Sequence, residues 1–389
     1  MRLLFIHNSY YKESGEERSL YNLTNLISRN GNELKLYKRS TDEIEGIKYG
    51  RLKAFSSSLY NRESVNDILE NINSFEPDIV QVQNLYPLIS PSILPRIKEK
   101  DIPVVMRTPN FRLFCPTGLF YTKGAICERC VHSSFKELNC VLYNCTNSLP
   151  KSAAYATRNA YARVTEIIKN NVDAFIVQSE FYKQKFIAFG IPENKISIIP
   201  GFIGKLPEIN YNERGEYISF IGRLSPEKGI YEFIRAARAL PDIPFLIAGN
   251  HDRLSGILNE LPSNVTLTGH LRGKELDDVY RRSKAVVAPS LWYDSFPNTV
   301  IEAMSYAKTV IVSNLGPLPN IIEHEKHGLV FDPADREQLT SCIDMIYHNT
   351  NKAREMGMSA RKKVESEYNS EIVYSKLMDL YGSLISTPQ

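Results

Sequence analysis

The stretch that decides the fold is FIGRLSPEKG, at residues 220–229. It continues an apolar run, YISFI at 217–221, of the kind that forms a buried strand. Gly222 then marks a turn, and Pro226 and Glu227 favour the first turn of a helix. The stretch therefore predicts one strand–turn–helix unit, the repeating element of a doubly wound α/β fold.

The same alternation continues on both sides of this unit, with short apolar runs between longer segments of helical spacing. The expected strands of the second half are 217–221, 245–249, 265–269, 285–288, 309–312 and 328–331, and those of the first half are 3–6, 33–37, 78–82, 103–106 and 174–177. These two series predict two doubly wound domains with parallel sheets. Ligands of such sheets bind at the carboxyl ends of the strands, which we expect to face the cleft between the domains.

The length agrees with two domains, because 389 residues exceed the roughly 250–300 that one hydrophobic core supports. A connector rich in proline and glycine, PGFIGKLP at 200–207, separates the two series. We therefore expect an N-terminal domain at 1–200 and a C-terminal, ligand-binding domain at 201–370. A last helix at 371–389 is expected to pack back on the first domain.

The composition is that of an ordinary soluble protein, with 43% hydrophobic and 23% charged residues. No apolar run approaches the roughly 18–20 residues of a membrane span. The apolar residues 1–6 are too few for the core of a signal peptide. We expect a cytoplasmic protein with no nucleic-acid partner.

The formal charge of +3 conceals an asymmetry between the halves. Residues 1–200 carry 26 Lys and Arg against 20 Asp and Glu, whereas 201–389 carry 21 against 24. The excess lies in 105–169, with nine basic and three acidic residues. This stretch is either a solvated basic face or a surface for anionic lipid or a phosphate-bearing substrate. Its segment 151–169 has two readings of its own, a helix with a buried face or an interfacial helix on acidic lipid.

Cysteines are concentrated in the same region, where five fall within 31 residues: Cys115, Cys127, Cys130, Cys140 and Cys145. Disulfides are not expected in a cytoplasmic protein. A Cys-x2-Cys pair followed by Cys-x4-Cys has spacing compatible with tetrahedral zinc. One hypothesis is a structural zinc on the last four of these cysteines, pinning an insertion at about 115–150, with Cys115 or His132 as a replacement ligand. The alternative is reduced cysteines packed as small hydrophobes.

Two cations stand at the turn after the strand 217–221. Arg223 and Lys228 lie five residues apart, so both can converge on the start of the expected helix, where a diphosphate would bind. The alternative is that Lys228 only pairs with an acidic surface residue.

A second group of polar residues follows the strand 285–288, in PSLWYDSFPNTVIEAM at 289–304. Asp294 precedes an expected helix and Glu302 lies within it, two turns further along. The backbone N–H groups of Asn298 and Thr299 would face an anion at the start of that helix. Glu302 could accept hydrogen bonds from vicinal hydroxyls such as those of a ribose.

Together these residues resemble a known family. Gly222 and Arg223, followed by Lys228 and Gly229 and then by Asp294 with Glu302-Ala303-Met304, resemble the donor domain of the family 4 retaining glycosyltransferases, which have the GT-B fold. Thr268-Gly269 lies between them as in that family. SGEE at 14–17 resembles the family's glycine loop, so the resemblance covers essentially the whole chain.

The resemblance implies that 1–200 is the acceptor-side domain and 201–370 the donor-binding domain, and it implies roles for these residues. Arg223 and Lys228 would bind the donor diphosphate and Asp294 the hydroxyls of the transferred sugar. Further donor contacts are implied for Glu302 with the ribose, Asn298 and Thr299 with the phosphate or sugar, Gly269 and His270 with the base, and Gly15 as the point of close backbone approach.

The chain also departs from the family's pattern. Asp294 replaces the usual glutamate, and Pro297 replaces a glycine that donates an N–H. Pro109 stands where the family often has a histidine, and Gln83 lies in a strand end that often carries another. Asn110 is our first candidate to take over the missing histidine's contact with the sugar. These changes bear on the choice of donor sugar more than on the reaction class.

The resemblance implies a transferase that moves a sugar from a nucleotide diphosphate donor to a glycan or lipid-linked acceptor, in cell-surface polysaccharide or glycolipid synthesis. The leaving diphosphate would help to deprotonate the acceptor, which requires cations rather than a strong protein base. No Asp-x-Asp motif occurs in the chain, so we expect no catalytic metal.

Other readings stay open: a nucleotide-sugar epimerase or hydrolase of the same fold, or a non-catalytic nucleotide-sugar-binding protein. A dehydrogenase is disfavoured because Gly15 lacks the rest of a Gly-x-Gly-x-x-Gly motif. The protein could also sit peripherally on the inner face of an anionic membrane.

Overall fold

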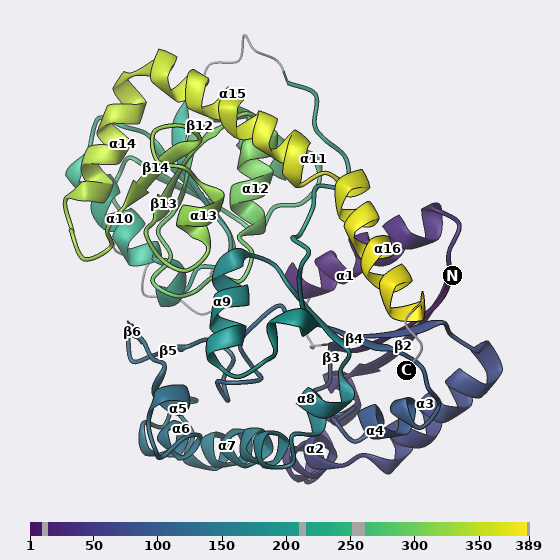
Figure 1. Cartoon of the computed structure of the whole chain (residues 1–389). Helices are drawn as coiled ribbons and strands as arrows, with labels where there is room; N and C mark the ends of the chain where they lie inside the picture. Colours follow the sequence, from purple (N-terminus) through teal and green to yellow (C-terminus); the bar gives the residue numbers. More distant parts are fainter. Residues whose placement is uncertain (10–14, 210–214, 251–260, 387–389) are drawn as a thin grey trace. The chain divides into compact units, whose positions relative to one another are not determined.

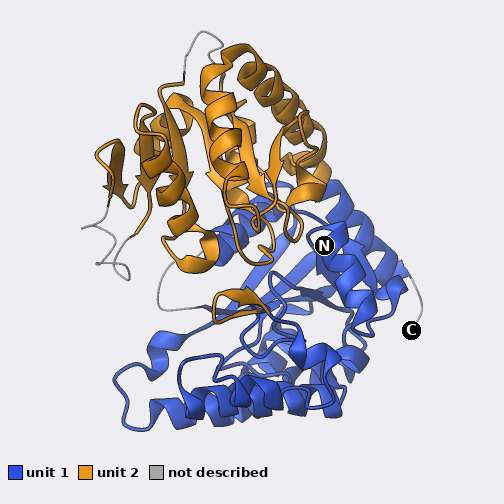
Figure 2. Ribbon diagram, turned by 90° about the vertical axis from the view of Figure 1, so that its left-hand side faces the viewer, with its two compact units in different colours: residues 1–120, 127–200, 373–389 blue, residues 121–126, 201–372 orange. Residues whose placement is uncertain are grey.

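The computed structural model describes residues 1–9, 15–209, 215–250 and 261–386 (Figure 1). The chain forms two compact units (Figure 2). Unit 1 consists of Met1–Phe120, Cys127–Pro200 and Val373–Gln389, and unit 2 of Tyr121–Ile126 and Gly201–Ile372. Each unit is built on its own sheet of six parallel strands.

The sheet of unit 1 has the strand order β2-β1-β3-β4-β7-β8. Its strands are β1 (Arg2–Ser9), β2 (Glu33–Ser40), β3 (Ile79–Asn84), β4 (Val104–Arg107), β7 (Ala174–Val177) and β8 (Ile196–Ile198). β3, β4 and β7 are buried along their whole length. This burial explains why most residues of β4 and β7 are apolar, since helices cover both faces of a parallel sheet. β3 differs, because it carries the buried polar residues Gln81, Gln83 and Asn84.

The helices of unit 1 complete its doubly wound fold. They are α1 (Gly15–Arg29), α2 (Gly50–Leu59), α3 (Arg62–Phe75), α4 (Ile93–Lys98), α5 (Arg129–His132), α6 (Leu138–Leu142), α7 (Leu149–Val164), α8 (Ile167–Asn171), α9 (Glu180–Ala188) and α16 (Ser370–Ser386), with short 3-10 turns at Thr41–Ile44 and Glu193–Lys195. From Val373 onward α16 belongs to unit 1. There Tyr381 is fully buried and its hydroxyl donates to Gln81 Oε1 of β3.

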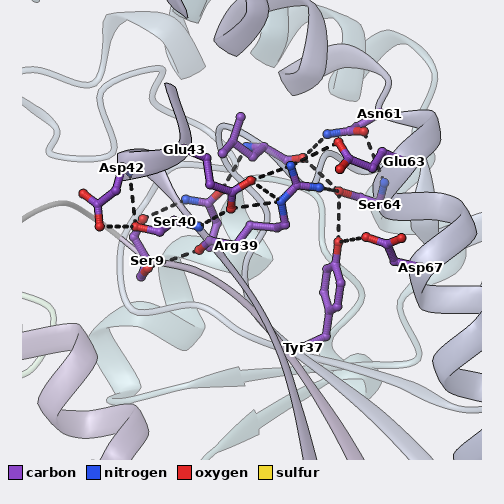
Figure 3. A network of polar contacts seen from close by, with 12 residues as sticks. Ser9, Tyr37, Arg39, Ser40, Asp42, Glu43, Asn61, Glu63, Ser64 and Asp67 are labelled. Atoms are coloured by element: carbon purple, nitrogen blue, oxygen red, sulfur yellow. Dashed lines mark hydrogen bonds and ion pairs between the residues drawn. The ribbon is translucent and has the colours of Figure 1, made fainter. Parts of the chain in front are cut away.

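A polar network closes the carboxyl end of β2 (Figure 3). The Arg39 guanidinium donates to both carboxylate oxygens of Glu43, at 3.0 and 2.8 Å from Nε, and its Nη2 lies 3.2 Å from Glu63 Oε2. Ser9 Oγ donates to the Arg39 carbonyl at 3.1 Å, so the network also holds the last residue of β1. Arg39 is 7% exposed, a depth at which a cation needs paired carboxylates.

The insertion predicted at about 115–150 contains two kinds of structure. Strands β5 (Tyr121–Thr122) and β6 (Ala125–Ile126) pair antiparallel and group with unit 2. The short helices α5 and α6 belong to unit 1. Helix α5 packs against α6, and α6 packs against α7. The segment 151–169 is two helices rather than one, because α7 ends at Val164 and α8 begins at Ile167.

The sheet of unit 2 has the strand order β11-β10-β9-β12-β13-β14. Its strands are β9 (Tyr217–Ile221), β10 (Phe245–Ala248), β11 (Val265–Gly269), β12 (Ser283–Ala288), β13 (Thr309–Ser313) and β14 (Gly328–Phe331). Its helices are α10 (Ile230–Ala239), α11 (Lys274–Arg282), α12 (Asn298–Ser305), α13 (Leu318–Ile321), α14 (Gln338–His348) and α15 (Thr350–Glu367), with a 3-10 turn at Pro226–Lys228. Buried side chains of β9, β10, α10 and α14 form one core, and those of α12, β13 and α15 form another.

The predicted α/β class with two parallel sheets is confirmed, and each predicted strand is present. Strand β8 was not predicted, because only three residues pair there. Among the described residues no helix combines the length and apolar character that crossing a bilayer requires.

Candidate functional site in unit 2

The candidate site lies where the strand order of unit 2 reverses. From the central strand β9 the chain proceeds outward through β10 to β11, and then returns to add β12, β13 and β14 on the other side. The loops that follow β9 and β12 therefore leave neighbouring strands in opposite directions, which opens a crevice at their carboxyl ends. Both groups of polar residues predicted from the sequence are on these loops or directly after them.

Glycines let the backbone pack tightly below the first loop. Gly222 has φ of +144° and its N–H donates to the Ala248 carbonyl at 2.9 Å. A Cβ on Gly249 would lie 1.9 Å from the Gly222 carbonyl oxygen, so a side chain there would displace the loop. The ends of β9 and β10 are thereby held at fixed positions.

The expected helix start at Pro226 is wrong. Pro226–Lys228 forms a 3-10 turn, and α10 begins only at Ile230. The reason is Gly229, whose φ of +76° interrupts the helix and whose position would place a Cβ 1.8 Å from the Pro289 carbonyl oxygen. The close approach brings the loop after β9 against the loop after β12, and Leu291 N–H donates to the Glu227 carbonyl at 2.9 Å.

Lys228 and Asp294 face each other across these two loops and form an ion pair. The Asp294 side chain is 11% exposed and that of Lys228 is 26% exposed. The Lys228 ammonium also lies 5.3 Å from the centroid of the Trp292 ring. The alternative that Lys228 pairs only with an acidic surface residue is therefore wrong, because its partner is a buried predicted site residue.

Arg223 lies on the same loop but is exposed, and its Nη2 donates to Glu227 Oε1. Each predicted cation is therefore already paired with one carboxylate. An ammonium has three N–H donors and a guanidinium has five, so both keep donors for a phosphate. The carboxylates fix the side-chain positions in advance.

Helix α12 carries the remaining predicted residues of this half. Glu302 Oε2 accepts from the Tyr280 hydroxyl at 2.7 Å, and Tyr280 is 2% exposed. Thr299 is half-buried and Asn298 is exposed. The expectation of a free Asn298 N–H is wrong, because it donates to the Phe296 carbonyl at 2.9 Å.

Tyr280 was missed by the sequence reasoning. It lies on α11, 22 residues before Glu302, and stacks on Tyr306 with 5.2 Å between ring centroids. A single tyrosine on a helix carries no spacing signal that would connect it to a carboxylate on another helix.

Gly269 ends β11, at the edge of the sheet, and His270 follows it. Gly269 has φ of +77°, and its carbonyl accepts from Gly249 N–H at 2.8 Å. His270 is exposed, and its Nε2 accepts from Arg272 Nε at 3.0 Å. This loop thus lies beside the end of β10, two strands away from Lys228.

Two predicted residues belong to unit 1. Gly15 is the first described residue of α1, and Ser14 of the expected glycine loop lies outside the described residues. Asn110 Oδ1 accepts from Arg112 N–H at 3.0 Å, so this side chain closes a local turn after β4.

The sequence reasoning also did not predict the burial of polar groups near the carboxyl ends of β3 and β4 in unit 1. Arg107 ends β4 and is 6% exposed, and Glu16 Oε1 is buried without a hydrogen-bond partner. Burial raises the pKa of Glu16 to about 7, against the opposing charges of Arg112 and Arg107. Burial likewise lowers the pKa of Arg107 to about 10. Nearby on β3, Gln83 Nε2 is buried and lacks a hydrogen-bond partner.

The five clustered cysteines are free thiols, and Cys130 and Cys140 pack with Cys145 against Ala156 of α7. Burial raises the pKa of Cys130 to about 12. No group of three or more described His, Cys, Asp and Glu side chains is arranged to hold a metal ion. The zinc site on Cys127, Cys130, Cys140 and Cys145 receives no support from this geometry and stays a prediction.

Two family models match most of the chain. The model for Glycosyltransferase Family 4 matches residues 14–204, and the model for Glycosyl transferases group 1 matches residues 205–363. An uncharacterized 42.6 kDa protein from the cps region of Klebsiella pneumoniae is 27% identical, over 68% of this chain and 64% of that protein. The alpha-galactosylglucosyldiacylglycerol synthase of Streptococcus pneumoniae is 24% identical, over 54% of this chain and 61% of that enzyme. The chain thus spans less than two thirds of these relatives.

Solved structures share the fold. Sucrose-phosphate synthase from Thermosynechococcus elongatus superposes with a TM-score of 0.73 at 17% identity, covering 99% of both chains. Anabaena HepE in complex with UDP and glucose gives a TM-score of 0.67 at 15% identity, covering 98% of this chain and all of HepE. With the family models on both halves and GT-B neighbours over the full length, the chain belongs to the family 4 glycosyltransferases.

Proposed function

We propose that the chain is a retaining glycosyltransferase that moves a hexose-type sugar from a nucleoside diphosphate donor to a glycan or lipid-linked acceptor in cell-surface polysaccharide or glycolipid synthesis. The observation that carries this proposal is the Lys228–Asp294 pair at the strand-order reversal of unit 2, with Arg223 on the same loop. Cations there suit a diphosphate, and the adjacent carboxylates suit hydroxyl groups.

In this proposal Lys228 and Arg223 bind the diphosphate, Asp294 binds hydroxyls of the transferred sugar, and Glu302, oriented by Tyr280, binds the ribose diol. The bond between the sugar's anomeric carbon and the β-phosphate oxygen breaks, and a bond from the acceptor oxygen forms on the same face. The acceptor's proton passes to the leaving diphosphate. Lys228 and Arg223 stabilise the negative charge that develops there.

The remaining assignments follow the resemblance to the family. Asn298, Thr299, Gly269 and His270 contribute to the donor site of unit 2. The resemblance also implies donor contacts for Gly15 and Asn110 of unit 1. No metal takes part, because the chain lacks Asp-x-Asp. Excess chelator should leave the rate unchanged; a rate lost in chelator and restored by magnesium would contradict this.

Names of similar proteins support the choice of substrates. The HepE structures hold UDP or UDP-glucose, which supports a nucleotide-sugar donor. The streptococcal relative is named as a diacylglycerol glycolipid synthase, which supports a lipid-linked acceptor.

The test is a screen of nucleotide sugars by thermal shift and turnover with the wild-type chain and with Arg223→Ala and Glu302→Ala. We expect one donor class to raise the melting temperature, and both substitutions to weaken that response. Lys326→Ala serves as the control, because Lys326 forms an exposed pair with Glu323 and is outside the loops that follow β9 and β12. An equal donor response in all variants would contradict the site. Donor binding without transfer or hydrolysis would identify a binding protein instead.

We also propose, as a separate point, a structural zinc on Cys127, Cys130, Cys140 and Cys145, with Cys115 or His132 as a replacement ligand. Their Cys-x2-Cys and Cys-x4-Cys spacing is the support. Metal analysis of protein purified without added zinc should find stoichiometric zinc, and a substoichiometric content would contradict the proposal.

A further inference from the structure

Exposed apolar side chains are concentrated on one part of unit 1. The described part of the chain exposes 17 large hydrophobic side chains, and ten of them fall in two segments, 47–60 and 135–164. They are Ile47, Tyr49, Leu52, Tyr60, Phe135, Leu138, Leu142, Leu149, Tyr161 and Val164. Scattered exposed hydrophobes are ordinary, but such a concentration marks an interaction surface.

The two segments lie on neighbouring helices. Both α2 and α6 pack against α7, and Figure 1 shows α6, α7 and α2 in a row along one side of unit 1. On α6, Leu138 and Leu142 are one turn apart and are 50% and 63% exposed. On α7, Tyr161 and Val164 are likewise one turn apart and are 37% and 71% exposed. We call residues 47–60 and 135–164 the α2–α6–α7 surface.

The charge of the α2–α6–α7 surface is strongly positive. Its segments contain seven Lys and Arg and a single acidic residue, Glu137. Glu137 is 6% exposed and is neutralised by Arg163, whose Nε lies 2.7 Å from its Oε1. Lys48, Arg51, Lys53 and Lys151 are exposed. The surface thus presents exposed cations and apolar side chains together, although Arg158 is 4% exposed and adds nothing to its charge. Exposed carboxylates lie just outside its segments, at Glu45 and Glu166.

We propose that the α2–α6–α7 surface docks on a bilayer that contains anionic lipid. Leu, Phe, Tyr and Val side chains would enter the boundary between headgroups and acyl chains, while the long stems of Lys and Arg let their charges stay at the phosphates. Either contribution alone gives weak binding, and the two together give stable but reversible attachment. A protein partner matched to this surface would need many carboxylates around an apolar centre, whereas an anionic bilayer supplies both features everywhere.

This proposal goes beyond the transfer reaction and is tested without it. Purified protein is sedimented with vesicles of phosphatidylcholine alone and with vesicles of equal parts phosphatidylcholine and phosphatidylglycerol, at low and high salt. We expect binding to the anionic vesicles only, and weaker binding at high salt because surface charges are screened.

Two double variants separate the apolar from the charged contribution. Arg51→Gln with Lys53→Gln should lower partitioning about 25-fold, since each cation near an anionic surface contributes roughly five-fold. Leu138→Ser with Leu142→Ser should lower it at least about ten-fold, from the lost burial of the leucine side chains. The matched controls change exposed residues outside the segments of this surface: Lys362→Gln with Lys376→Gln for charge, and Met345→Ser with Met358→Ser for exposed apolar area.

All four double variants change exposed side chains, and thermal unfolding verifies that they fold. The proposal is overturned if the wild type stays in the supernatant with anionic vesicles, or if the surface variants sediment like their controls. It is also overturned if light scattering shows a dimer that Leu138→Ser with Leu142→Ser abolishes and that persists when anionic vesicles are added. A missing thermal-shift response to donors does not contradict membrane docking. Failure of this proposal is therefore distinguishable from failure of the proposed reaction.

Discussion

The carboxyl ends of the strands differ between the two units. In unit 2, charged groups at this edge are paired: Lys228 with Asp294, and Arg223 with Glu227. In unit 1, the corresponding edge contains buried atoms without hydrogen-bond partners, namely His7 Nδ1, Glu16 Oε1 and Gln83 Nε2, although the other ring nitrogen of His7 lies 2.9 Å from Glu17 Oε1. Unit 2 has two such atoms in its loops, Ser225 Oγ and Trp292 Nε1, and neither carries charge.

The difference shows two ways of holding polar groups before a ligand arrives. Paired charges are fixed in position, so a donor can bind without reorganising them. Unpaired buried groups carry a desolvation cost that contact with a ligand would relieve. We therefore expect substitutions of the paired groups in unit 2 to lower activity or stability. Substitutions of the unpaired groups in unit 1 should leave the free energy of unfolding unchanged or raise it, because they remove a desolvation cost.

The largest expected effect is that of Lys228→Ala. It removes the cation proposed to bind the diphosphate and leaves the Asp294 carboxylate buried without its partner. We expect kcat/KM for transfer to fall about 100- to 1000-fold, the usual cost of losing one electrostatic contact to the developing charge. Initial rates at varied donor concentration measure this. Lys326→Ala is the control, and a loss below about ten-fold would contradict the role of Lys228.

Gly229→Ala should cause the next largest change, on stability rather than rate. The substitution forces a Cβ toward the Pro289 carbonyl oxygen at a φ of +76°, so either the loop or the start of α10 must move. We expect a loss of about 3 kcal/mol or more in the free energy of unfolding, measured by urea denaturation. Gly204→Ala, where a Cβ meets nothing within 4 Å, should change it by less than about 1 kcal/mol. Equal effects would show that the two loops do not restrain each other.

The paired edge of unit 2 was accessible from the sequence, and the unpaired edge of unit 1 was not. Arg223 and Lys228 share one loop, and Asp294 and Glu302 lie eight residues apart in the segment after β12, so their spacing in the sequence pointed to each pair. Glu16, Gln83 and Arg107 come from α1, β3 and β4, and only the fold makes them neighbours of one sheet edge.

Local backbone detail also limited the sequence prediction. The parallel strands were predictable because short runs rich in β-branched apolar residues are typical of the buried strands of a parallel sheet. The false helix start at Pro226 arose because proline and glutamate favour a first turn, whereas the contact of Gly229 with Pro289 is set by packing 60 residues away in the chain. Tyr280 was missed for the same reason, since it contacts Glu302 only through the packing of α11 against its neighbours.

In unit 1, Glu16→Gln should change how stability depends on pH. The folded state holds the Glu16 proton up to a pKa of about 7, above the ordinary value of 4.5 for the unfolded chain. Stability of the wild type therefore falls as pH rises from about 4.5 to 7, because only the unfolded state releases the proton easily. Glutamine has no proton to release, so the variant should gain about 1–3 kcal/mol relative to wild type between these limits. Urea denaturation at several pH values measures the difference, and exposed Glu70→Gln is the control. A difference that does not vary with pH would contradict the buried, protonated carboxyl.

The smallest expected effect, and the sharpest contrast with unit 2, is that of Gln83→Met. Methionine has nearly the same length as glutamine, so the substitution keeps the packing and removes the buried Nε2 that lacks a partner. We expect the free energy of unfolding to stay the same or rise by up to about 1 kcal/mol, because no hydrogen bond is lost and a desolvated donor disappears. The matched change in unit 2 is Tyr280→Phe, which removes the 2.7 Å bond to Glu302 and should cost about 1 kcal/mol. If Gln83→Met costs as much as Tyr280→Phe, the strand ends of unit 1 are satisfied in solution and the contrast between the units fails. If it costs nothing but raises the KM for acceptor, the unpaired groups of unit 1 are kept for binding rather than for folding.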